Sequence, residues 1–227
     1  MALKTVLCMA ILGFASLSSA AGRPVPGNLK NLYNRAKNNR CNSPLSSKGL
    51  KDGHGRSGFT YCGDHEGIIY ITGPSNAMGL SDMDSQTAFK HEVAKYGIED
   101  LDSNKHGYVV LGNEGERPSY LPSSSGVESL SVVAVVCNNR LFYGIWGDTN
   151  GGTDTGEASM SLAHACFPGD HLSGNNGHEG HDVLYVAFKG KEAKPGAKGA
   201  NWKARNFDNF ERSLAHIGNK LVAKIKA

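Results

Sequence analysis

Six short apolar segments set the strongest constraint on the fold of this chain. They occupy residues 59–62, 67–72, 108–111, 131–137, 141–146 and 183–188. Most are rich in β-branched and aromatic residues, and turn-forming residues separate them, a pattern typical of β-strands. Because the segments do not alternate between apolar and polar residues, they predict strands buried on both faces or a small closed barrel. The pair Asn138-Asn139 predicts a hairpin between two of them.

Four segments with helical spacing accompany the predicted strands. They span residues 29–36, 85–97, 160–166 and 207–222, with Ser85 placed to cap the second and Gly97 to end it. The 29 glycines have no G-X-Y period, which excludes collagen and favours many turns. We therefore predict one α+β domain with a compact, six-stranded, mostly antiparallel β-barrel-like core and peripheral helices. A double-psi barrel is the specific topology we expect.

The N-terminal segment has the layout of a secretory signal peptide. Lys4 precedes the apolar run 6–14, and Ser18 and Ala20 suit the −3 and −1 positions of a cleavage site. The apolar run is too short for a membrane span, which makes an anchor the weaker alternative. We predict a signal peptide over residues 1–20, a single folded domain over 21–227 and a secreted, extracellular protein.

The charge and the cysteine content are compatible with an extracellular protein. The 24 basic and 21 acidic residues are scattered and give a net charge of +3, so we expect no nucleic-acid partner, no membrane partner and a monomer. Removal of the predicted signal leaves Cys41, Cys62, Cys137 and Cys166. Four cysteines allow three pairings, and we favour Cys41–Cys62 and Cys137–Cys166 because each pair brackets one local excursion of the chain.

Two carboxylates stand at the ends of a glycine-rich loop. The apolar strand over 141–146 leads to Asp148, and Glu157 is expected to open the following helix. Such a pair could supply an acid and a base at a fixed separation, as glycosidic cleavage requires. On spacing alone, ordinary turn bonding by Asp148 and a helix-dipole role for Glu157 are the stronger explanation. A calcium loop is a further alternative, but Gly152 and Ser159 do not match the EF-hand pattern.

Several further sequence motifs favour a catalytic role for Asp148 and Glu157 over the structural explanation. Residues 143–162 contain GDTNGG and TGEAS, and other matching stretches are FTYCGD at 59–64, TAFKHEV at 87–93, GIEDLD at 97–102, YVVLGNE at 108–114 and LSVVAVVC at 130–137. Together they resemble the fungal-type endo-chitosanases of glycoside hydrolase family 75. The resemblance implies that residues 21–227 form a chitosanase catalytic domain that hydrolyses β-1,4 links in chitosan with inversion. It assigns the catalytic pair to Asp148 and Glu157. We predict that Asp148 is the general base and Glu157 the general acid, and we expect no cofactor.

Other side chains are candidates for substrate contact. Thr149 and Asn150 could orient the attacking water or Asp148, or could make plain turn bonds. Tyr61, Tyr143 and Trp146 could stack on sugar rings, although aromatic residues in strands are more often core. Because chitosan carries ammonium groups, carboxylates should line its cleft. The candidates on loops are Asp64, Glu66, Asp82, Asp84, Asp100, Asp102 and Glu114.

Two further functions remain open at this point. His178 and His181 form an H-x-x-H pattern, with His164 and His171 upstream, and would suit a zinc-dependent hydrolase. Their loop is rich in Gly and Asn and no HExxH motif occurs, so we predict no metal site and interpret His178 as a residue of the cleft. A secreted, non-catalytic polysaccharide-binding protein is the other alternative. It would have no need of both carboxylates.

Overall fold

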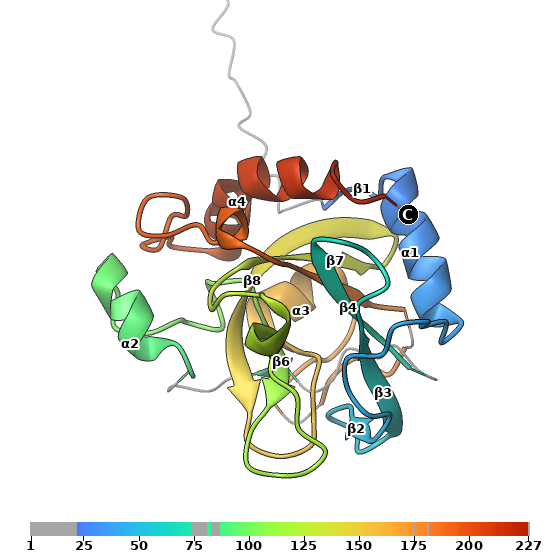
Figure 1. Ribbon diagram of the computed structural model, residues 1–227. Helices are drawn as coiled ribbons and strands as arrows, with labels where there is room; N and C mark the ends of the chain where they lie inside the picture. The colour runs from blue at the N-terminus through green and yellow to red at the C-terminus, as the bar shows by residue number, and fades with distance from the viewer. Residues whose placement is uncertain (1–21, 74–80, 83–86, 175, 181, 227) are drawn as a thin grey trace, which may run out of the picture.

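One curled β-sheet organises the chain (Figure 1). The computed structural model describes residues 22–73, 81–82, 87–174, 176–180 and 182–226, so the predicted signal peptide, Asp84 and His181 lie outside the described residues. In spatial order the strands are β2 (Leu50–Lys51), β3 (Ser57–Cys62), β4 (Ile68–Thr72), β10 (Leu184–Phe188), β7 (Val132–Cys137), β8 (Arg140–Asn150), β6 (Tyr108–Asn113), β9 (Glu157–Ser159) and β5 (Ser81–Asp82). A further strand, β1 (Arg23–Pro24), pairs with β8.

Pairing is antiparallel throughout except between β6 and β8 and between β5 and β9. The sheet curls far enough for its ends to meet. Lys51 in β2 donates its N–H to the carbonyl of Thr153 (3.0 Å), and Thr155 donates to the carbonyl of Lys51 (2.9 Å). The segment that leads into β9 is therefore bonded to the opposite end of the sheet, which gives the barrel-like form expected from the sequence.

The six predicted strands correspond to β3, β4, β6, β7, β8 and β10. Six is not the strand count of the sheet, because β1, β2, β5 and β9 are also present. Each of these has two or three residues and is too short to carry a periodic signal. The Asn138-Asn139 hairpin is confirmed, with positive φ angles of 45° and 56° and with Cys137 opposite Arg140.

Two expectations about the glycine-rich loop are wrong. The strand before it does not end at Asp148 but continues as β8 to Asn150, because its last residues pair with β6. Glu157 does not open a helix. It begins β9, which pairs with β6, and helix α3 begins three residues later and spans Met160–Cys166.

Alternate residues of each strand contribute to two cores. One set, which includes Val133 and Val135, packs inside the curl together with α3. The other, which includes Val132 and Ala134, packs outside it against helices α1 (Gly27–Lys37) and α4 (Phe207–Val222).

The predicted helix over 85–97 appears as α2 (Lys90–Val93) and the 3₁₀ turn η1 (Ala94–Tyr96), and Gly97 ends it in the left-handed conformation. Ser85 lies outside the described residues. Two more 3₁₀ turns are η2 (Pro122–Ser125) and η3 (Lys191–Ala193).

Helix α4 begins at a good cap and crosses β8 closely. The Asn206 side chain accepts from the N–H of Asn209, which satisfies one of the free amides of the first turn. At the crossing, a Cβ on Gly218 would lie 2.4 Å from the ring of Tyr143, so only glycine fits there. None of the helices in the described part of the chain has the length and apolar character of a membrane span.

A partly buried ion pair ties the start of the described chain to α4. Glu211, 2% exposed, accepts from both guanidinium nitrogens of Arg23, one of them at 3.1 Å. The same carboxylate accepts the N–H of Tyr143 in β8 at 3.0 Å. Three elements distant in sequence therefore share one carboxylate, and we refer to Arg23, Tyr143 and Glu211 as the β8 clamp.

Both predicted disulfides are present. Cys41 pairs with Cys62, and Cys137 at the end of β7 pairs with Cys166 at the end of α3. The second bridge braces the helix that directly follows β9 against a central strand of the sheet. It therefore constrains the element that carries Glu157.

We expect the double change Cys137→Ser/Cys166→Ser to lower turnover under conditions in which the chain is still folded. The loop closed by the bridge has a sequence separation of 29 residues, and its loss should cost about 3 kcal/mol in the chain-entropy description. Activity and far-UV circular dichroism measured on the same preparation across a urea series would separate loss of turnover from loss of fold. Cys41→Ser/Cys62→Ser is the matched control, and it should lose stability without losing turnover per folded molecule.

Candidate active site

Asp148 occupies an irregular position in β8. Trp146 lies opposite Val109 of β6 but Asp148 lies opposite Val110, so Gly147 is an extra residue that bulges from the ladder. A Cβ on Gly147 would lie 2.6 Å from the Cβ of Tyr108, which excludes any other residue. The Oδ1 atom of Asp148 accepts the backbone N–H of Ala88 (2.7 Å) and of Thr149 (2.8 Å). Two backbone donors thus fix the orientation of a carboxylate that is only 7% exposed.

Glu157 reaches the same strand from its other side. Gly156 has a φ of +83°, which favours glycine, and donates its N–H to the carbonyl of Val110 at 2.9 Å. Glu157 then pairs opposite Val110 across the antiparallel β6–β9 ladder and is half-buried. The left-handed glycine turns the chain out of the loop and into the strand that positions this carboxylate.

Val110 therefore has one candidate carboxylate opposite it on each side. Asp148 in β8 and Glu157 in β9, nine positions apart along the chain, lie on either side of β6 with Val110 between them. Adjacent strands are about 4.8 Å apart, so the two Cα atoms are separated by about 10 Å. The sheet brings the carboxylates together, as the sequence predicts. It does so through the β6 ladder and not through the loop alone.

Thr149 and Asn150 extend this row along β8. Asn150 lies two residues beyond Asp148 and so faces the same side of the strand. Its side-chain nitrogen is buried and has no hydrogen-bond partner among the described residues, while its carbonyl accepts the N–H of Glu114 at 2.8 Å. Thr149 makes one long contact from its hydroxyl to the carbonyl of Leu111 (3.4 Å). Asn150 thus offers an unused donor next to Asp148.

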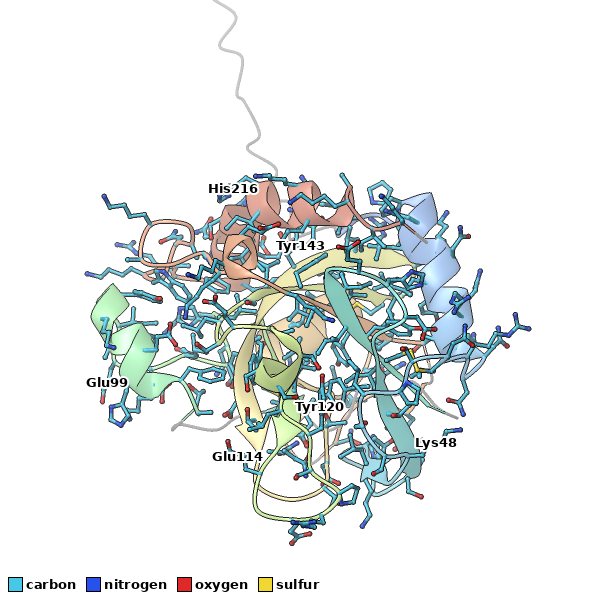
Figure 2. The ribbon with its side chains drawn as sticks, viewed as in Figure 1. Lys48, Glu99, Glu114, Tyr120, Tyr143 and His216 are labelled. Atoms are coloured by element: carbon cyan, nitrogen blue, oxygen red, sulfur yellow. A yellow bond between two sulfur atoms is a disulfide. The ribbon has the colours of Figure 1, made fainter. Side chains whose placement is uncertain are left out.

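The predicted aromatic contacts are core residues. Tyr143 is fully buried beneath α4, where its hydroxyl donates to Asn219 (2.8 Å) and Arg23 lies over its ring (Figure 2). Trp146, 2% exposed, packs edge-on against Phe89 and donates its indole N–H to the carbonyl of Asp148 (2.8 Å). Tyr61 is also fully buried. These rings have no exposed face for a sugar, and Trp146 acts on the site by supporting the backbone of Asp148.

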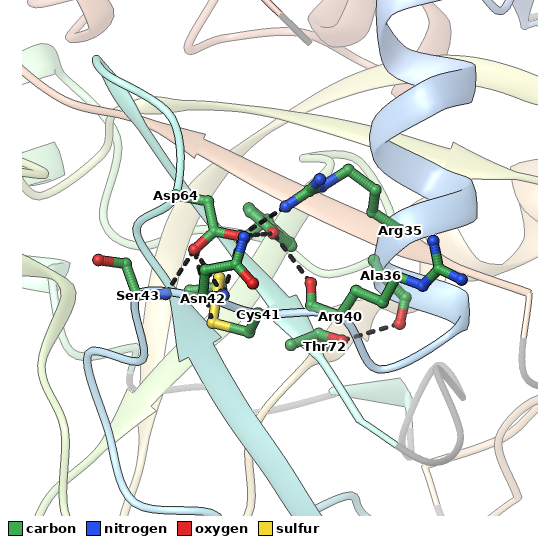
Figure 3. Close-up of polar contacts among 10 residues, drawn as sticks. Arg35, Ala36, Arg40, Cys41, Asn42, Ser43, Asp64 and Thr72 are labelled. Atoms are coloured by element: carbon green, nitrogen blue, oxygen red, sulfur yellow. Dashed lines mark hydrogen bonds and ion pairs between the residues drawn. A yellow bond between two sulfur atoms is a disulfide. The ribbon is translucent and has the colours of Figure 1, made fainter.

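Asp64 is not available to a ligand because contacts within the protein occupy its carboxylate (Figure 3). Its carboxylate accepts the N–H of Asn42 and of Ser43, pairs with Arg35 at 2.8 Å and receives the hydroxyl of Tyr70. Burial raises the pKa of Asp64, but these donors more than offset burial and hold the net pKa below its ordinary value. The group closes the loop beside the Cys41–Cys62 bridge.

We expect Asp64→Asn to lower the melting temperature at neutral pH and to leave turnover per folded molecule unchanged. A depressed pKa in the folded state stabilises the protein above the ordinary carboxyl pKa, about 3.9, and that contribution is lost as the pH falls through the lower, folded value. The difference in melting temperature between the two proteins should therefore shrink below about pH 4. Thermal melts from pH 3 to pH 7 test this, and a constant difference across that range would contradict it.

Of the remaining acidic candidates, some are held by internal hydrogen bonds and others are exposed. Asp100 holds the N–H and hydroxyl of Thr87, and Asp102 pairs with Lys105 and accepts from Asn104 in a turn. Glu66 and Glu114 are exposed, and the side chain of Asp82 lies outside the described residues. Glu114, which follows β6 and bonds to Asn150, is the exposed carboxylate that the described structure ties to the Asp148 row (Figure 2).

His178 is held between two carboxylates. Its ring stacks on Phe167 with 3.4 Å between centroids, and its nitrogens bond to Asp170 (2.6 Å) and Asp182 (2.8 Å). Within the described residues, the group of three side chains with ligating atoms close enough for a metal is Cys41, Cys62 and Asp64, where both sulfurs belong to a disulfide. His164 and His171 are exposed. The histidine loop is therefore a hydrogen-bonded structure that connects the end of α3 to the start of β10.

Sequence reasoning missed the contributions of the backbone. The backbone N–H of Ala88 binds the Asp148 carboxylate. The bulge at Gly147 sets the position of Asp148 in the ladder, and Gly156 sets that of Glu157. The motif over 87–93 marks the segment that holds Ala88, but a backbone donor leaves no side-chain signal. Tyr185, whose position matters below, is indistinguishable in sequence from an ordinary strand aromatic.

Comparison with known proteins places the chain in a family. A family described as "Fungal chitosanase of glycosyl hydrolase group 75" matches residues 67–224, which include both carboxylates. An endo-chitosanase of Aspergillus fumigatus is 48% identical over 236 residues, covering 96% of this chain and 98% of its own length. An endo-chitosanase of Aspergillus oryzae is 46% identical over 242 residues, and an endo-chitosanase B of that fungus is 46% identical over 239, with the same coverage of both chains.

Proposed function

Because this chain belongs to the fungal chitosanases of glycosyl hydrolase group 75, we propose that it is an endo-acting chitosanase that inverts the configuration of the anomeric carbon. Asp148 is the general base and Glu157 the general acid. The observation that carries this assignment is their position opposite the two sides of Val110. A Cα separation of about 10 Å is compatible with the 6.5–9.5 Å between carboxyl groups that an inverting enzyme needs to accommodate a water molecule.

The two residues then divide one displacement between them. Asp148 takes a proton from water as the water oxygen bonds to the anomeric carbon, and the bond from that carbon to the leaving oxygen breaks. Glu157 gives its proton to the leaving oxygen. The backbone donors on Oδ1 favour the ionised, oriented form of Asp148 that a base requires. Asn150, with its unused side-chain donor, is suited to hold the attacking water, and Thr149 supports the strand between them.

Substrate recognition rests on charge. The ammonium groups of chitosan favour exposed carboxylates, and Glu114 beside Asn150 is the first such group we assign to the cleft. His178, fixed by Asp170 and Asp182, contributes through the shape of its loop.

A reducing-end assay on chitosan, run beside cellulose and fully acetylated chitin, tests the substrate. We expect rapid release of ends from chitosan alone, with an early fall in viscosity if cleavage is internal. Proton NMR of the first products should show the α-anomer, and initial release of the β-anomer would overturn inversion. Binding without release of ends would support the non-catalytic polysaccharide-binding protein.

We also propose that the protein is secreted and acts as a monomer. All four cysteines of the described chain are paired in disulfides, which suits an oxidising compartment. Leu45 is the single large hydrophobic side chain that the described residues leave exposed, so they offer little apolar surface for self-association. The parallel β6–β8 pairing within a mostly antiparallel curl is compatible with a double-psi barrel.

A further inference from the structure

Two tyrosines inside the curl adjoin the segment that leads into Glu157. The first, Tyr61 in β3, is fully paired. Its hydroxyl oxygen accepts the N–H of Gly112 at 2.6 Å and contacts the hydroxyl of Thr155. Tyr61 therefore links the segment before β9 to β3 and β6.

The second tyrosine, Tyr185 in β10, differs in one respect. It is 4% exposed, yet its hydroxyl has no hydrogen-bond partner among the described residues. A buried hydroxyl without a partner is unfavourable, and in a folded protein such a group calls for an explanation. Its ring lies against Gly156, because a Cβ built there would be 3.6 Å from Cε2 and 3.8 Å from Cδ2.

The candidate acid acts electrostatically on Tyr185. Burial raises the pKa of the Tyr185 phenol well above its ordinary value of 10, and the negative charge of Glu157 raises that pKa further. The phenol therefore keeps its proton at every working pH. It is a permanent donor, beside the residue that precedes Glu157, and it interacts electrostatically with the carboxylate that proton transfer would create.

We propose that Tyr185 is a positioning residue for Glu157, whose buried hydroxyl donates a hydrogen bond to the Glu157 carboxylate as the acid releases its proton. This inference rests on the proposed function, in which Glu157 is the general acid. Catalytic hydrogen bonds often lengthen in the absence of substrate and tighten when it binds. A donor of this kind stabilises the anion more than the neutral acid and so makes Glu157 a stronger acid.

Tyr185→Phe removes only the hydroxyl and tests the proposal through the pH profile. We expect the basic limb of the kcat/KM profile on chitosan to move to higher pH by about half a unit or more, because the pKa of Glu157 rises when the donor is lost. The kcat at the optimum should fall about 3- to 10-fold, since a weaker acid protonates the leaving oxygen less readily. The melting temperature should stay level or rise, because an unsatisfied buried hydroxyl has been removed.

Tyr70→Phe is the matched control. Tyr70 lies in the neighbouring strand β4 opposite Val186, belongs to the outer core and bonds to Asp64. Its loss should lower stability and leave the pH profile in place. A Tyr185→Phe profile that overlays the wild type would overturn the proposal. A shift of equal size in Tyr70→Phe would overturn it too, since the effect would then be general.

A second measurement keeps the test independent of that variant. Uniform replacement of tyrosine by 3-fluorotyrosine lowers phenol pKa values and strengthens the donor, so the basic limb of the wild type should move to lower pH. The same replacement in Tyr70→Phe should give the same shift, and no shift in either protein counts against the proposal. A wild-type protein without activity on chitosan would instead overturn the proposed function itself.

Discussion

Turnover on chitosan should fall at least about a hundredfold when Asp148 is changed to Asn or Glu157 to Gln. Each change keeps the shape of the side chain but removes the group that accepts or gives the proton. The amide oxygen introduced by Asp148→Asn can still accept the N–H groups of Ala88 and Thr149 that Asp148 now holds. The melting temperature and the affinity for substrate should therefore change little. Steady-state kinetics with melting curves on the same preparations measure both.

Asp154 supplies the control in the same loop. It is a partly buried carboxyl whose pKa is raised by burial and by the neighbouring Asp52 and Glu116, while Lys51 lowers it. A raised pKa alone could suggest a general acid. Its backbone, however, pairs with Lys51 at the junction of the sheet ends and not with β6. Asp154→Asn should therefore retain most activity. If Asp154→Asn were inactive while Asp148→Asn turned over normally, the base would be Asp154.

Glu211→Ala should lower the free energy of unfolding by about 1–3 kcal/mol, because it leaves the buried N–H of Tyr143 without its acceptor and Arg23 without its ion pair. Glu211 is almost fully buried and serves both groups of the β8 clamp. Glu211→Gln keeps one acceptor oxygen and should lower the free energy of unfolding by less. Urea denaturation at neutral pH gives the difference.

The matched control is Glu192→Ala on the exposed turn η3. Glu192 pairs with Lys224 at 2.7 Å, but both side chains are more than half exposed. Exposed ion pairs contribute little to stability, so this change should have no measurable effect. Equal losses in the free energy of unfolding for Glu192→Ala and Glu211→Ala would show that burial does not strengthen the β8 clamp.

The long strands and the helices could be predicted because each carries its own signal. β7 and β10 are unbroken apolar runs, and α4 has an apolar stripe over sixteen residues. β2 and β9 could not, since strands of two or three residues exist only where a partner strand is already present. The same reason explains the error at Glu157. Its neighbours suit the start of a helix, but the partner strand β6 decides its conformation.

The candidate site was predictable to the level of residue type and not of geometry. The order of motifs identifies Asp148 and Glu157, whereas their meeting across Val110 depends on a strand encoded far earlier in the chain. Asp64 shows the opposite limit. A carboxylate after a strand looks like a cleft ligand until the two backbone amides and the guanidinium that hold it are known.

The β8 clamp has a consequence for the order in which the protein is made. Residues 207–222 leave the ribosome after all ten strands, so until then the part of β8 that α4 covers, which includes Tyr143, lacks that cover. A contact that joins residues 188 positions apart cannot form while the later one is still unsynthesised. The chain therefore stays incompletely folded throughout synthesis. That condition suits the secretion proposed above, in which an incompletely folded chain would pass through an export channel and the last helix would then hold the first strand in place.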